Sequence, residues 1–85
     1  DVDEVVERAD KNDLGLASYI YTNNLEKAHK ASELMETGTV AVNTGVVALP
    51  EAPFGGIKQT GYGREGGSMA IKDYLNIKYT HLGIV

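Results

Sequence analysis

The chain has 85 residues, a formal net charge of −4 and no cysteine. It contains no basic run and no apolar stretch near the roughly 20 residues that a spanning helix needs, so we expect neither a nucleic-acid partner nor a membrane segment. The lack of cysteine excludes disulfides and thiolate metal sites in these residues and is typical of a reducing compartment. We therefore expect a cytoplasmic location and no metal site.

The first quarter of the chain predicts a helix followed by a strand. Over residues 1–12 an apolar residue recurs every three or four positions, which indicates an amphipathic helix. Residues 12–15 supply a stop and a turn. Residues 16–22 then alternate as a strand with apolar side chains on both faces, so we expect this strand inside a sheet that is covered on both sides.

A second helix and a second strand follow. The helix is predicted over residues 25–37, with Asn23 as its N-cap and Gly38 at its end, and the strand over residues 39–43. The alternation of helix and strand predicts an α/β layer with a parallel sheet. Because sites lie at the carboxyl ends of parallel strands, we expect Asn43 at the edge of a site.

Two further segments, residues 44–52 and 76–82, predict contacts with other parts of a protein. Residues 44–52 are unusually apolar for a loop, and either a pocket wall or a subunit contact would explain this. Ser68 is the expected N-cap of a short helix over residues 69–75. Residues 76–82 alternate as a terminal strand, which needs a sheet edge to pair with.

A glycine-rich loop over residues 53–67 dominates the second half of the chain. Six of its fifteen residues are glycine, but bulky and charged residues between them indicate a loop with one fixed path. Residues 61–66 match G-x-G-x-x-G, the pattern of a dinucleotide site. We reject that interpretation because no buried strand precedes the match and no acidic residue follows about 20 positions later. No cofactor-binding residue is assigned in this chain.

This loop carries a family resemblance. It reads Pro53-Phe54-Gly55-Gly56-x-Lys58-x-Thr60-Gly61-x-Gly63-Arg64-Glu65, which closely resembles the C-terminal signature of the NAD(P)-dependent aldehyde dehydrogenases. The likeness continues through residues 14–26, 38–43 and 74–79, and is closest to the succinate-semialdehyde dehydrogenase branch. Enzymes of that family are several times longer and this chain starts without Met, so the resemblance implies a C-terminal fragment. Residues 1–75 would be part of the α/β catalytic domain, and residues 76–85 an oligomerisation strand.

The resemblance implies an enzyme that uses NAD or NADP to oxidise an aldehyde, such as succinate semialdehyde or another short semialdehyde, to its acid. The family's catalytic cysteine is not among these 85 residues, and the cofactor would be bound by absent parts, so we expect the fragment itself to be inactive. The parent would be a homodimer or homotetramer. The alternative is a non-catalytic assembly module whose apolar loop and terminal strand serve only association.

The same resemblance assigns roles to single residues. Phe54 would border the aldehyde pocket beside the nicotinamide, although it could instead anchor the loop in the core. Glu65 would belong to a proton relay with an upstream lysine, or else form a structural ion pair. Arg64 is expected to tie loops together by hydrogen bonds of its guanidinium. We assign Asn43 and Ala48 to substrate binding. Ala48 stands where the branch typically has a serine that holds the distal carboxylate, which weakens the case for succinate semialdehyde.

Overall fold

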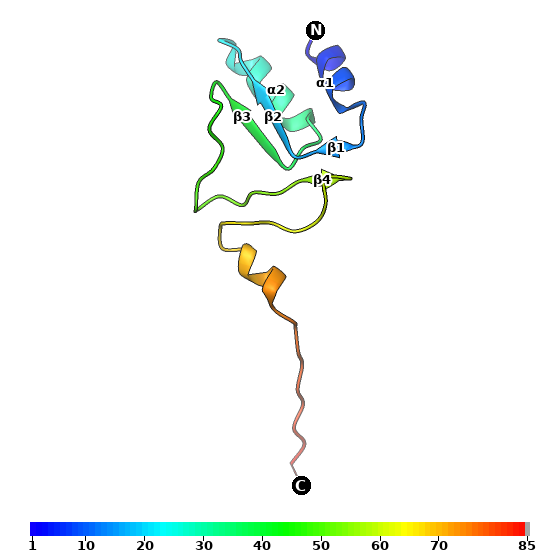
Figure 1. The fold of residues 1–85 in the computed structure, drawn as a ribbon, viewed down its shortest axis with the longest axis vertical. Helices are drawn as coiled ribbons and strands as arrows, with labels where there is room; N and C mark the ends of the chain where they lie inside the picture. The colour runs from blue at the N-terminus through cyan, green and yellow to red at the C-terminus, as the bar shows by residue number, and fades with distance from the viewer. Residues whose placement is uncertain (85) are drawn as a thin grey trace.

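The computed structural model describes residues 1–84 and shows two helices over a pair of parallel strands, followed by a long loop and an extended tail (Figure 1). In chain order the elements are α1 (Val2–Asp10), β1 (Leu14–Gly15), β2 (Ala17–Ile20), α2 (Leu25–Leu34), β3 (Thr39–Val42), β4 (Ile57–Lys58) and a 3-10 helix (Ala70–Tyr74). No helix in the described part of the chain has the length and apolar character to cross a bilayer.

The parallel pairing of β2 with β3 confirms the predicted α/β layer. The register runs from Ala17 opposite Thr39 to Ile20 opposite Val42. The buried core is small and comes from both helices and the sheet, namely Val6, Ala28, Ala31 and Ala41. The Lys30 Nζ–Asp3 Oδ2 ion pair, at 2.6 Å, also joins α2 to α1. Three of the four core residues are alanine, so the helices lie close to the sheet but bury little apolar area.

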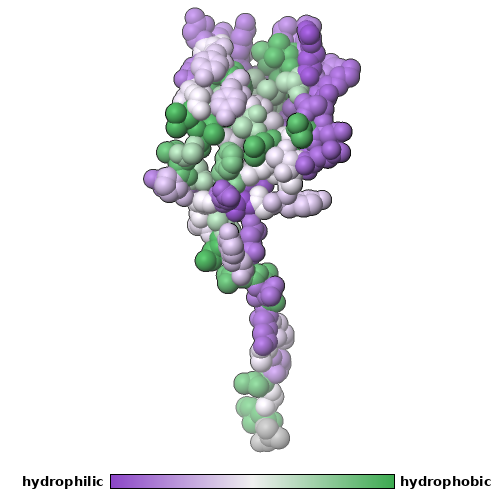
Figure 2. Space-filling model, viewed as in Figure 1, coloured by the Kyte–Doolittle hydropathy of each residue, from purple (hydrophilic) through white to green (hydrophobic). Residues whose placement is uncertain are grey.

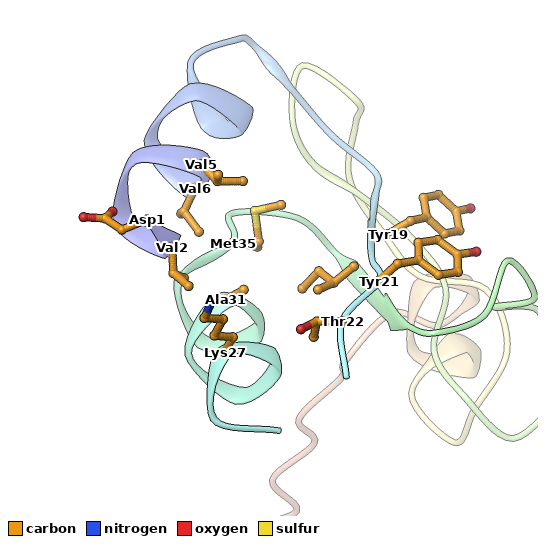
Figure 3. Close-up of a pocket in the computed structure, with 11 residues that line it drawn as sticks. Asp1, Val2, Val5, Val6, Tyr19, Tyr21, Thr22, Lys27, Ala31 and Met35 are labelled. Carbon is orange, nitrogen blue, oxygen red and sulfur yellow. The ribbon is translucent and has the colours of Figure 1, made fainter. Parts of the chain in front are cut away.

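The expectation that both faces of the sheet are covered is wrong for this chain. Tyr19 and Tyr21 are 50% and 68% exposed. Their rings lie next to each other and project away from Val6 and Met35 (Figure 3). Successive strand residues point to opposite faces, and both helices lie on the other face from the tyrosines. No other layer of the described chain covers the tyrosine face.

The two predicted ends of α2 need correction. Its N-cap is Asn24 and not Asn23, since the Asn24 side chain accepts a hydrogen bond from the Lys27 amide at 2.9 Å. The helix ends at Leu34 rather than near Gly38, and Met35 is already extended. The amide of Glu36 donates to both carboxylate oxygens of Asp10 at 3.1 Å, so a contact with the end of α1 redirects the chain before the glycine is reached.

Gly38 instead provides a close contact with the glycine-rich loop. A Cβ built on Gly38 would overlap the carbonyl oxygen of Gly55. The neighbouring turn, residues 12–15, also makes an unexpected pairing: β1 is antiparallel to β4, with Leu14 opposite Lys58 and Gly15 opposite Ile57. The glycine-rich loop therefore folds back onto the end of the α/β layer.

The C-terminal segment departs most from the prediction. The short helix is a 3-10 helix whose N-cap is Met69 without a side-chain cap, and not Ser68. Residues 76–82 form no strand, and within the described residues no other segment pairs with them. Ile77 and Tyr79 are 102% and 82% exposed, and Figure 2 shows hydrophobic (green) and hydrophilic (purple) residues mixed along the tail. An edge strand needs a partner, and residues 1–84 offer none.

The tail gives the molecule its length. The Cα radius of gyration is 17.9 Å, whereas a compact domain of this size has about 12 Å. The longest dimension is 68 Å, against 25 and 21 Å for the other two. The tail therefore lies clear of the body, as Figure 1 shows.

Candidate functional site

Two of the predicted site residues are paired through their backbones. The amide of Phe54 donates to the carbonyl oxygen of Glu65 at 2.7 Å, and the amide of Glu65 donates to that of Phe54 at 2.7 Å. This isolated antiparallel bridge closes the neck of the glycine-rich loop. The aromatic ring and the carboxylate are therefore held on adjacent chain segments at a fixed separation of the backbones.

Arg64 ties the loop together, as predicted. Its Nη1 donates to the carbonyl oxygens of Gly56 at 2.9 Å and Gly63 at 2.8 Å. Its backbone amide donates to Oδ2 of Asp73 at 2.8 Å. The guanidinium thus joins the two sides of the loop just inside the Phe54–Glu65 bridge.

Further contacts fasten the loop to the α/β layer. The Oγ1 of Thr60 accepts from the amide of Gly15 at 2.8 Å, and the amide of Gln59 donates to the carbonyl of Asp13 at 2.8 Å. Lys58 forms an ion pair with Glu36, with 3.0 Å between Nζ and Oε2. Each of these contacts joins the loop to an element from the first half of the chain.

A surface depression brings three of the four predicted site residues together. Ala48, Phe54 and Glu65 all line a depression of about 340 Å³ with other residues of the loop at 48–52 and Gly66. Phe54 is half-buried, and Glu65 is exposed. No cation of the described residues lies within ion-pair distance of Glu65, and its role in a proton relay stays a prediction.

Phe54 and Glu65 also line an adjacent depression of about 320 Å³ with Arg64, Asp73 and Tyr74. An aromatic wall beside an accessible carboxylate can exclude water on one side and exchange a proton on the other. The pair therefore suits the edge of a pocket that a second part of a protein would complete.

Asn43, the fourth predicted residue, lies elsewhere. It follows β3 and has the left-handed backbone angle φ of 57°. Its Oδ1 accepts from the amide of Thr22 at 2.9 Å, and its Nδ2 donates to the carbonyl of Thr22 at 2.9 Å. The carboxamide thus joins the carboxyl ends of β2 and β3, where the sequence places it. Its contact with substrate stays a prediction.

Another depression is unrelated to these residues. It measures about 450 Å³ and lies between α1, α2 and β2, where Val6, Ala31 and Met35 are among its lining residues (Figure 3). None of Asn43, Ala48, Phe54 or Glu65 borders it. Within residues 1–84, no three His, Cys, Asp or Glu side chains gather closely enough to hold a metal ion.

Sequence reasoning missed two residues that hold the loop. Thr60 reaches back to Gly15, and Asp73 reaches the amide of Arg64. The threonine stands inside the glycine-rich motif, so its position was a usable signal. Asp73 carries no such signal, because a charged residue on a short helix looks like part of a solvated face.

Comparisons with known proteins identify the family of the chain. The model of the family described as "Aldehyde dehydrogenase family" matches residues 1–80. The chain belongs to the aldehyde dehydrogenase family, and its α/β fold with parallel strands is that of a part of such a protein.

Individual relatives are dehydrogenases that are named for particular aldehydes. It is 52% identical over 81 residues to a 3-sulfolactaldehyde dehydrogenase of Pseudomonas putida. It is 43% identical over 81 residues to an NADP-dependent succinate-semialdehyde dehydrogenase of Escherichia coli K12. Each match covers 95% of this chain but only 17% of the relative. A crystal structure of an E. coli NADP-dependent enzyme is 43% identical to this chain and superposes with a TM-score of 0.90. The match covers 99% of this chain and 18% of the chain in that crystal structure.

Proposed function

We propose that the chain is part of an enzyme that oxidises a short aldehyde with an anionic group at its far end to the carboxylic acid. The balanced reaction is aldehyde plus water plus NAD(P)⁺ giving carboxylate, NAD(P)H and two protons. The family match over residues 1–80 is the observation that carries this proposal. The fold and the Phe54–Glu65 bridge support it, since they put an aromatic and a carboxylate at the edge of an open depression.

The residues of this chain serve the pocket rather than the bond-making steps. A thiol nucleophile and a bound nicotinamide, which accepts the hydride, belong to other parts of the enzyme. Phe54 forms an apolar wall beside the aldehyde, and Glu65 passes a proton from the water that hydrolyses the acyl intermediate. Asn43 holds the strand ends from which the following loop departs.

The relatives support an anionic group at the far end of the aldehyde, and Ala48 bears on which residues hold it. Succinate semialdehyde carries a carboxylate and 3-sulfolactaldehyde a sulfonate, so the two named relatives act on aldehydes with an anion at the other end. The methyl group of Ala48 lines the depression beside Phe54 but cannot donate a hydrogen bond. In this enzyme the anion is therefore held by donors other than the side chain at position 48.

Turnover by the full-length protein tests this function. The formation of NAD(P)H is measured with succinate semialdehyde, 3-sulfolactaldehyde and propanal, each with NAD and with NADP. We expect kcat/KM for one of the anionic aldehydes to exceed that for propanal by at least about 100-fold, because a site with donors for the anion leaves them unpaired with propanal. Equal kcat/KM values for all three aldehydes would contradict the proposed anionic substrate class. No turnover with any of them would contradict the proposed enzyme function.

The assembly of the parent is a further part of the proposal. Residues 76–84 carry exposed apolar side chains and have no partner in the described chain, which supports a role as an oligomerisation strand in a homodimer or homotetramer. The strand expected over residues 76–85 ends at Val85, which lies outside the described residues. The same exposed tail favours the rival function, a non-catalytic assembly module, and the turnover experiment separates the two. The cytoplasmic location stays a prediction.

A further inference from the structure

We propose that Asp73 is a positioning residue for the Phe54–Glu65 pair, and this inference rests on the proposed aldehyde oxidation. Its carboxylate accepts the amide hydrogen of Arg64 at 2.8 Å, from a position nine residues further along the chain. Asp73 lies on the 3-10 helix, outside the glycine-rich loop. Asp73 therefore anchors the glycine-rich loop from outside that loop.

The Asp73 carboxylate lies close to the backbone of Gly63. A Cβ built on Gly63 would lie 2.9 Å from Oδ2 of Asp73, and Gly63 has a φ of 86°, which side chains rarely adopt. The absence of a side chain at this position lets the carboxylate approach the backbone. A hydrogen bond from an amide to a charged oxygen is roughly twice as strong as one to a neutral acceptor.

The effect of Asp73 reaches both site residues through one short path. The amide of Arg64 donates to the Asp73 carboxylate, and the Arg64 guanidinium donates to the carbonyl oxygen of Gly56. The next residue, Glu65, makes both hydrogen bonds of the bridge to Phe54. Only the two backbone torsions of Arg64 separate the peptide plane that carries its amide hydrogen from the plane that carries the Glu65 amide, so a shift of the Arg64 amide is passed to the bridge. Asp73 thus fixes the direction from which Glu65 and Phe54 face the depression.

The test uses three variants of the full-length enzyme. Asp73→Ala removes the acceptor, Asp73→Asn retains an acceptor oxygen without the charge, and Lys72→Ala is a matched control. Lys72 lies on the same 3-10 helix, is exposed, and its side chain has no hydrogen bond among residues 1–84. We expect kcat to fall about tenfold in Asp73→Ala, since small displacements of positioned groups cost factors of this size or more. We expect Asp73→Asn to stay within about threefold and Lys72→Ala to be unchanged, with KM for NAD(P) constant throughout.

Hydrogen exchange gives a second measurement that does not depend on turnover. In Asp73→Ala the amide of Arg64 should exchange faster, and in Asp73→Asn and Lys72→Ala it should remain protected. Wild-type kcat in folded Asp73→Ala, equal losses in all three variants, or unchanged exchange at Arg64 would each overturn the proposal. If the wild-type enzyme oxidises no aldehyde, the proposed function fails, and the exchange measurement still tests whether Asp73 holds the loop.

Discussion

At the scale of single residues, the glycine-rich loop depends on a contact in which neither partner has a side chain. A Cβ at Gly38 would overlap the Gly55 carbonyl, so Gly38→Ala must push the loop away from the α/β layer. We expect the substitution to lower the free energy of unfolding by about 1–3 kcal/mol in the full-length protein, the range seen for overpacking. Thermal or denaturant unfolding would show the change as a lower midpoint.

Gly45→Ala is the matched control for this prediction. Among the described residues, a Cβ built on Gly45 would meet only the Oη of Tyr21 at 3.7 Å, which is an ordinary van der Waals contact. The same substitution should therefore leave the unfolding midpoint nearly unchanged there. A Gly38→Ala variant as stable as the Gly45→Ala variant would show that the loop does not rest on Gly38.

The residue scale also shows what the sequence could predict about the site. Resemblance singled out Phe54 and Glu65, and the tying role of Arg64 followed from guanidinium chemistry; the structure confirms the latter. That the first two share a backbone bridge depends on how the loop closes, which no local pattern encodes. Asp73 could not be predicted either, because its partner is a backbone amide, and every residue except proline has one.

At the scale of elements, the start of α2 distinguishes two neighbouring asparagines. Asn24 caps the helix through the Lys27 amide, and the side chain of Asn23 makes no hydrogen bond within the described chain. We expect Asn24→Ala to cost about 1 kcal/mol of stability, and Asn23→Ala less than about 0.5 kcal/mol. Denaturant midpoints of the two variants measure the difference. A larger loss in Asn23→Ala would restore the N-cap that the sequence predicts.

A second element, the tail, should govern assembly. Ile77→Asp puts a charge on an apolar position that an oligomer would bury, so we expect the parent to shift toward monomers. Light scattering coupled to size-exclusion chromatography measures the mass. Thr80→Asp adds the same charge on the other side of the extended segment and should preserve the oligomer. An Ile77→Asp protein with wild-type mass would argue against an oligomerisation strand.

Helices and strands that depend on nearby residues could be predicted from the sequence, whereas features that depend on distant contacts could not. Helix α1, strand β3 and the parallel layer follow from periodicity within a few residues. The pairing of Leu14–Gly15 with Ile57–Lys58 was missed because two residues carry no alternation and the partner is distant. The early end of α2 was missed for a similar reason, since Asp10 of another helix redirects the chain there.

At the scale of the whole molecule, the 85 residues lack a group that the proposed reaction needs. They contain no cysteine and span 17% of the length of the relatives compared. We expect the purified chain alone to give no NAD(P)H with succinate semialdehyde or propanal, because no thiol is present to attack the carbonyl. The full-length enzyme, assayed under identical conditions, is the positive control. Turnover by the short chain would mean that another nucleophile carries the reaction.

The tethering of the loop to distant residues sets an order of folding. The Asn43–Thr22 link joins residues 21 positions apart, whereas the Thr60–Gly15 link spans 45 positions. Doubling the length of a closed loop costs about 0.6 kcal/mol more entropy, and non-local contacts slow folding. The β2–α2–β3 unit should form first, and the glycine-rich loop should dock afterwards. On heating, the loop should be the first part to open, so the enzyme would lose activity before it loses its fold.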